Sequence, residues 1–238
     1  MIFGRKKAQP EPDDLDDDLD DELIDDDDSD DDSIEAAEPE ETDEWARFDA
    51  SRDWRDDGPF DIDEVDLDAD DDEIQRIDLG ALIITPEPGM AIKLVADAAT
   101  QQVRQVVVEH GQAAAQLTVF AAPATGDYRG ELRQEMIAQT AGAKVVELAK
   151  GPFGTELRRV LTVTDAEGRE GFAPLRDWLI AGPRWVLDVR LIGQAAIDSE
   201  NKELGGFFEE FVRNLIVRRG DTAMAPGSVV PLQPTGQK

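Results

Sequence analysis

The stretch Gly182-Pro-Arg-Trp-Val-Leu-Asp-Val-Arg-Leu-Ile192 decides the fold. After the Gly182-Pro183 turn, large apolar residues take every second position, and most positions between them are polar. This period of two predicts a β-strand with one face in a core and the other face in water. The core positions are Trp185, Leu187, Val189 and Leu191, which alternate with Arg184, Val186, Asp188 and Arg190.

Further strands are predicted on the N-terminal side of this one. The Gly151-Pro-Phe-Gly154 turn and a polar loop at residues 165–168 are short connections, which favour antiparallel pairing of the strands they join. An extended piece at residues 82–86 opens the series. The predicted strands that follow are residues 92–95, 103–109, 113–120, 145–149, 155–163 and 170–180.

Two helices are predicted among these strands. Asp127 is a suitable N-cap for the first, and Gly142 a suitable stop. The second begins after Asp198-Ser199 and is predicted to end at Arg218-Arg219-Gly220, with the alternative that the β-branched Ile216-Val217 pair leaves it early as a short strand. The resulting order, βββ-α-ββββ-α, predicts an α+β fold in which two helices pack on a largely antiparallel sheet.

The charge of the chain is unevenly distributed. Of a formal net charge of −31 in 238 residues, about −29 lies in the first 80, where 36 acidic residues face 7 basic ones. Residues 1–44 hold too few apolar side chains to fold alone, so we predict a disordered Asp-rich arm. The α+β domain is predicted at residues 77–221 and a loose C-terminal tail at residues 222–238, in which Met224-Ala-Pro226 and Val229–Leu232 could lie against the domain.

Residues 45–76 differ from the arm because aromatic residues stand among the acids. Trp45, Trp54 and Phe60 are the candidates for contact with another surface. Such a mixture is typical of a segment that docks, either on a partner or on its own domain. The favoured interpretation is docking on the chain's own domain, with Gly58-Pro-Phe-Asp61 as an anchor turn.

Several chemistries have no support in the sequence. The chain has no cysteine, and its one histidine, His110, stands at a predicted turn. Phosphate-loop, dinucleotide and serine-nucleophile motifs are lacking, and we predict no cofactor. The acids around Asp57 resemble a calcium loop, but Arg55 occupies a ligand position, so no metal site is predicted. Without a signal peptide or membrane span, a cytoplasmic protein is expected.

Arginines on the predicted strands are the candidates for a charged surface. A basic strip would suit nucleic acid, but the domain is nearly neutral, so a face on which the acidic arm lies is favoured. The candidates are Arg158, Arg159, Arg176, Arg184 and Arg190, of which Arg158, Arg184 and Arg190 are assigned to an interaction surface. An enzyme would instead need buried, converging acids among Glu131, Glu135, Glu156, Asp188 and Asp198.

Five short segments carry a resemblance to a known family: Gly58-Pro-Phe-Asp61, Arg76-Ile-Asp-Leu-Gly80, Gly151-Pro-Phe-Gly-Thr-Glu-Leu157, Gly182-Pro-Arg-Trp185 and Arg219-Gly-Asp221. These segments resemble the actinobacterial family catalogued as domain of unknown function 3710. The similarity runs from about residue 58 to residue 232, with a departure at Ile84-Thr-Pro-Glu-Pro88. The resemblance implies a cytoplasmic address but no activity and no catalytic residues. The strand–helix order is also similar to the Mog1/PsbP-type sandwich, whose members are mostly binding or assembly factors.

These observations favour a non-enzymatic interaction module that carries an acidic regulatory or solubilising arm, with a protein partner that the sequence does not identify. One alternative is a protein linked to nucleic acid, in which the arm imitates nucleic acid and competes for a basic face. Another is an enzyme that uses carboxylates or a bound ion. No membrane association is expected.

Overall fold

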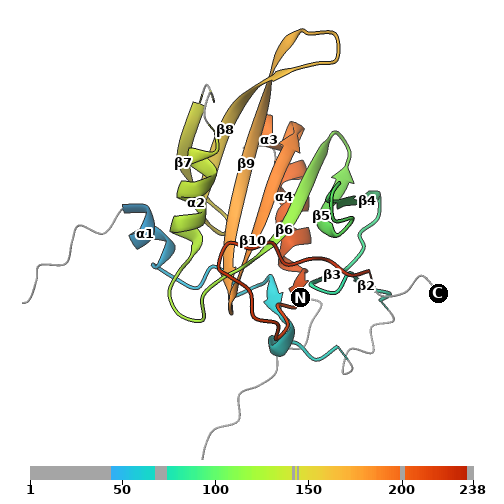
Figure 1. Ribbon diagram of the computed structural model, residues 1–238, viewed down its shortest axis with the longest axis vertical. Coiled ribbons are helices and arrows are strands. Elements are labelled where there is room, and N and C mark those ends of the chain that lie inside the picture. Colours follow the sequence, from blue (N-terminus) through green and yellow to red (C-terminus); the bar gives the residue numbers. More distant parts are fainter. Residues whose placement is uncertain (1–43, 68–73, 141–142, 144, 199–201, 235–238) are drawn as a thin grey trace, which may run out of the picture.

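The computed structural model describes residues 44–67, 74–140, 143, 145–198 and 202–234. Its main element is a seven-stranded sheet in which all neighbouring strands are antiparallel (Figure 1), as the sequence predicts. The predicted arm is residues 1–44, of which residues 1–43 lie outside the described residues, whereas Glu44 is the first residue of a helix. In spatial order the strands are β4 (Met90–Ala96), β5 (Val103–His110), β6 (Ala113–Ala121), β10 (Trp185–Gly193), β9 (Glu170–Gly182), β8 (Gly154–Thr164) and β7 (Val145–Gly151).

Helices lie on both faces of this sheet (Figure 1). The helix α4 (Lys202–Arg213) follows the short α3 (Gln194–Ile197), and its residues Phe208, Phe211 and Val212 complete the main core. The core-facing residues of β10 are the four predicted ones, Trp185, Leu187, Val189 and Leu191. The α+β class, with helices packed on an antiparallel sheet, is therefore as predicted.

The second face of β10 is not in water, so that prediction is wrong. Helix α2 (Arg129–Ala138) covers part of this face, and Val186 is fully buried in a cluster with Leu132 and Met136. Asp188 is also buried, at 4% exposure. The reason is position, since β10 is the central strand and both of its faces are covered. Helix α2 itself begins two residues after Asp127, whose carboxylate accepts a hydrogen bond from the Arg129 N–H.

A second, four-stranded sheet closes one end of the core. Its order is β1 (Phe60–Asp61), β11 (Ile216–Val217), β3 (Leu82–Ile84) and β2 (Ile77–Asp78). Because Ile216-Val217 pairs with β3 and β1, helix α4 ends at Arg213, so the predicted helix end at residues 218–220 is wrong. The short strand left open as an alternative is the correct one.

Segments at both ends of the described chain pack against this core. On the N-terminal side, α1 (Glu44–Asp49) and a 3₁₀ turn, η1 (Ile62–Glu64), flank β1. On the C-terminal side, Val230 and Leu232 are buried, and their N–H groups donate to carbonyls of Val119 on β6 and Val103 on β5. None of the helices in the described ranges has the length and apolar character that a membrane crossing requires.

Candidate anion-binding pocket

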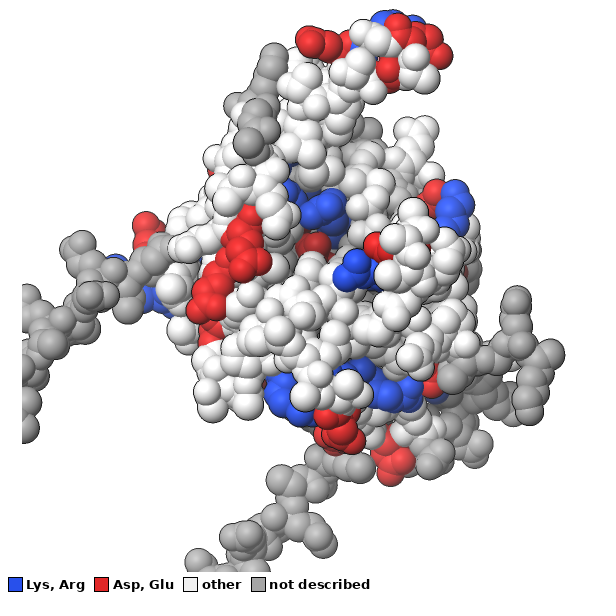
Figure 2. Space-filling view, viewed as in Figure 1, with Lys and Arg blue, Asp and Glu red and all other residues white. Residues whose placement is uncertain are grey.

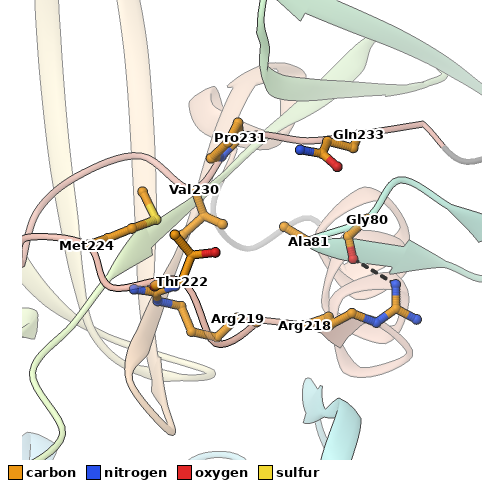
Figure 3. A pocket seen from close by; sticks show the side chains of 10 residues that line it. Gly80, Ala81, Arg218, Arg219, Thr222, Met224, Val230, Pro231 and Gln233 are labelled. Carbon is orange, nitrogen blue, oxygen red and sulfur yellow. Dashed lines mark hydrogen bonds between the residues drawn. The ribbon is translucent and has the colours of Figure 1, made fainter.

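A pocket of about 450 Å³ lies where three chain segments meet (Figure 3). The turn between β2 and β3 forms one side of the pocket. The chain after β11 forms its floor, and the C-terminal segment forms the opposite side. Most of its wall is apolar, from Ala81, Met224, Val230 and Pro231. Arg219 is the principal charged group in it, and Thr222 and Gln233 are at its edges.

Local backbone requirements hold these segments together. Gly80 has φ +80°, and a Cβ there would lie 3.1 Å from the backbone of Gln233, so the C-terminal segment passes at this distance only because residue 80 is glycine. The Gln233 N–H donates to the Leu79 carbonyl at 2.7 Å. Arg218 points away from the pocket and donates to Asp78 and to the Gly80 carbonyl, which fixes the turn from the other side (Figure 3).

Arg219 is a buried cation without a carboxylate partner in the described part of the chain. The residue is 8% exposed, its Nη1 donates to the Thr222 carbonyl at 3.1 Å, and its buried Nε has no hydrogen-bond partner among the described groups. Burial, and then the nearby charge of Arg184, lower the pKa of Arg219. Buried guanidinium groups are normally paired, so this group is suited to an anion brought by a ligand.

The rim of the pocket adds to its positive character. Arg184 has a positive φ of 61° and donates to the Gly220 carbonyl at 3.2 Å. Asp221 approaches Arg184 only to 3.9 Å and is fully exposed, so it offsets little of this charge. The arrangement suits a ligand that presents an anionic oxygen to Arg219 and a hydrocarbon group to the wall.

The arginines predicted to form a basic strip do not share a face. Arg158 points to the α4 side of the sheet and binds Glu156, whereas Arg190 points to the α2 side and binds Asp177. Arg184 lies at the β9–β10 turn beside the pocket. Figure 2 shows the same pattern, with basic groups scattered among acidic and uncharged ones. The prediction of a strip, and of one surface holding these three arginines, is wrong because strand alternation separates them.

The aromatic candidates lie in the segment that packs on the domain. Trp54 donates from Nε1 to the Asp49 carbonyl, Phe48 lies between Trp45 and Trp54, and both tryptophans are half-buried. Phe60 is buried with Ile216 in a small cluster and so faces no partner.

The two acids that the structure buries among the sequence candidates, Glu156 and Asp188, lie on opposite faces of the sheet and do not converge. Glu156 accepts from Arg176 and Trp178 on the α4 side, while Asp188 is on the α2 side, and Glu131 and Glu135 are exposed. Burial acts to raise the pKa of Glu156, but hydrogen bonds from Arg176, Arg158 and Trp178 leave it lowered.

Sequence reasoning missed two features of these sites. Asp177 is fully buried on the same face as Asp188 and is held by Arg159 and Arg190. The second is Arg219, which the sequence predicts at a helix end, although the β-branched pair before it favours a strand.

The stretch that resembles a calcium loop is held by an ion pair. Arg55 binds both carboxylate oxygens of Glu64, at 2.9 and 3.0 Å, across this stretch.

Comparisons with known proteins place the chain in a family. A solved structure of cyanobacterial PsbP (CyanoP) from Synechocystis sp. PCC 6803 is similar at 10% identity, with a TM-score of 0.34, over 60% of this chain and 92% of that one. This likeness is too low to carry an argument. No curated protein matches. The profile of the family described as protein of unknown function (DUF3710) matches residues 58–238, and the chain therefore belongs to that family.

Proposed function

We propose that this protein is a non-enzymatic binding module whose pocket takes an acidic peptide segment with an apolar side chain next to a carboxylate. The observation that carries the proposal is Arg219, a buried guanidinium whose Nε has no partner in the described chain. A carboxylate that binds there accepts a charge-assisted hydrogen bond at a site shielded from water, where such a bond is stronger than one at the surface.

The wall of the pocket determines the rest of the ligand. Met224, Val230 and Pro231 offer hydrocarbon surface that an aliphatic side chain can contact. A nucleic acid would need several cations in a row along its backbone, and the sheet arginines are separated onto two faces. A peptide that carries both acid and leucine or isoleucine fits better.

The arrangement of potential catalytic groups supports a binding role over catalysis. His110 stacks on Phe207 with ring centroids 3.6 Å apart, and its Nδ1 is buried without a partner among the described groups. Asp177 and Glu156 are both held by arginines at 2.6–2.9 Å. These groups stabilise the fold, and the described pocket contains no acid–base pair.

The test is peptide binding, measured by fluorescence anisotropy with a labelled Asp-Asp-Leu-Asp-Asp peptide. The chain's own arm contains the same pattern, so the assay uses the full chain with Leu15, Leu19, Leu23 and Ile24 replaced by serine. In this background, Arg219→Gln should weaken binding at least about 10-fold, the loss of one charge-assisted hydrogen bond. Arg169→Gln, at an exposed hairpin tip, is the matched control and should leave binding unchanged.

A second variant protects the test against misfolding. Met224→Glu places a carboxylate in the pocket next to Arg219, so it should block the peptide and not lower the melting temperature. A peptide with serine in place of leucine should bind at least several-fold more weakly. Equal binding by the Arg219→Gln and Arg169→Gln proteins would show that the attraction is general electrostatics, and the proposal would fall.

A further inference from the structure

The arm at the N-terminus carries the same combination of groups as the ligand that the pocket suits. Between residues 13 and 28, one or two aliphatic residues at a time are flanked by acidic residues, as in Asp13-Asp-Leu-Asp-Asp17 and Asp21-Glu-Leu-Ile-Asp25. Each such unit offers a carboxylate and a hydrocarbon side chain within one or two residues. The chain therefore contains several potential ligands for its own pocket.

The arm is also long enough to reach. From residue 28 to Glu44, where the described chain begins, 16 residues span up to about 50 Å when extended. A domain of this size is about 40 Å across. The tether holds the units at an effective concentration of roughly millimolar, far above that of a partner in solution.

We infer that residues 13–28 of the chain occupy the Arg219 pocket and compete with external acidic peptides, so that the arm regulates access to it. This inference rests on the proposed function and adds the identity of the first occupant. One apolar side chain of the arm contacts the Met224–Val230 wall, and a neighbouring carboxylate accepts from Arg219. An external ligand binds only after it displaces this unit.

Another acidic stretch, residues 68–73, is nearer to the pocket along the chain because it leads to β2. It contains alanine as its only apolar residue, so it lacks the aliphatic group that the wall suits. An experiment can therefore tell the two occupants apart, because substitution of the aliphatic residues in the arm alters residues 13–28 and leaves residues 68–73 unchanged.

The experiment compares two full-length proteins with equal charge. One is the wild type, and the other carries serine at Leu15, Leu19, Leu23 and Ile24. With the labelled Asp-Asp-Leu-Asp-Asp peptide, the wild type should bind on the order of 10- to 100-fold more weakly, because a tethered competitor at millimolar concentration must be displaced. Ile34→Ser, an aliphatic substitution outside residues 13–28, is the control and should behave as the wild type.

Hydrogen exchange gives a readout that does not depend on the added peptide. Amides of residues 219–233 should exchange faster in the four-serine protein than in the wild type, and at equal rates in the wild type and Ile34→Ser. Equal peptide affinity in the wild type and the four-serine protein would overturn the inference. If Arg219→Gln still weakened peptide binding at least about 10-fold in that case, the proposed function would stand. If Arg219→Gln had no effect on peptide binding, both the proposed function and this inference would be refuted.

Discussion

Asp188 shows how a single residue on the central strand responds to burial. It lies on β10 opposite Thr118 of β6 and Leu179 of β9, and its Oδ1 has no partner among the described groups. The nearest cation is Arg190, at 3.8 Å from Oδ2. Burial, and then the charge of Asp177, raise the pKa of Asp188 to about 8, although Arg190 and Arg159 act against this. The neutral acid is thus the favoured form up to that pH.

This raised pKa predicts a pH dependence of stability. The unfolded chain releases the proton of Asp188 near pH 4 and the folded chain near pH 8, so the contribution of Asp188 to the free energy of unfolding falls as pH rises between these values. Asp188→Asn cannot ionise and should remove that fall. In denaturant unfolding, the free energy of unfolding of the variant should rise relative to that of the wild type by up to about 4 kcal/mol between pH 5 and pH 8.

The control for this prediction is Asp165→Asn. Asp165 is exposed, and its pKa is lowered chiefly by a hydrogen bond from the Arg169 backbone, so it is ionised throughout this range in both states. The free energy of unfolding of Asp165→Asn should differ from that of the wild type by the same amount at every pH from 5 to 8. If the free energy of unfolding of Asp188→Asn also differed from the wild type by a constant amount, Asp188 would be ionised in the folded chain.

The sequence could not predict the state of Asp188 because alternation reports only which residues share a face. Asp188 and Arg190 looked like a water-facing side of the strand. Their partners Asp177 and Arg159 are on β9 and β8, and the register that brings them together is a property of the whole sheet. The same limitation applies to Arg219, whose surroundings include Gly80 and Ala81, far away in the chain.

At the scale of elements, the strands were predictable and the ends of the helices were not. The strands from residue 145 to residue 193 follow from alternation and from turns with glycine or proline, which are local signals. The end of α4 depends on pairing of Ile216-Val217 with Leu82-Ile83, a contact that no local pattern encodes. Apolar periodicity continues past Arg213, and tertiary pairing overrides it.

Helix α1 illustrates how a short element is held by one buried acid. The Asp49 carboxylate, at 3% exposure, accepts from Arg133 at 2.5 Å and from the Thr155 N–H at 2.7 Å. A Cβ at Gly154 would lie 2.7 Å from Asp49 Oδ1, so glycine there permits the approach. A helix of six residues is not stable alone, which makes this contact the main attachment of the segment.

We therefore expect Asp49→Asn to loosen α1 without unfolding the sheet. The amide keeps the shape of the side chain but loses its charge, so the charge-assisted hydrogen bond from Arg133 is weakened at a cost of about 2 kcal/mol. Amide exchange at residues 45–55 should become roughly 30-fold faster, while the amides of β9 and β10 keep their rates. Glu44→Gln, an exposed change in the same helix, should alter neither. Uniformly faster exchange over the whole chain would contradict a local role.

At the scale of the whole molecule, segments distant in sequence join the two sheets. Trp185 on β10 donates from its indole to Asp61 on β1, at 2.7 Å. Leu232 donates its N–H to Val103 in the large sheet, and Gln233 donates to Leu79 beside the small one. The sequence indicated that residues 229–232 could lie against the domain but not where. The connection predicts that the two sheets unfold as one unit.

Leu232→Ala tests this cooperativity. The side chain is 4% exposed within the main core, so its loss should lower the free energy of unfolding by about 2–4 kcal/mol. Tryptophan fluorescence reports on all four tryptophans, of which Trp178 and Trp185 lie in the main core. Fluorescence and far-ultraviolet circular dichroism should give one coincident transition in denaturant, shifted to a lower denaturant concentration. Pro234→Ala, at an exposed position, should leave the midpoint unchanged. Separation of the two probes in the Leu232→Ala protein would mean that the small sheet and the tail melt before the large sheet, and the single cooperative unit would be refuted.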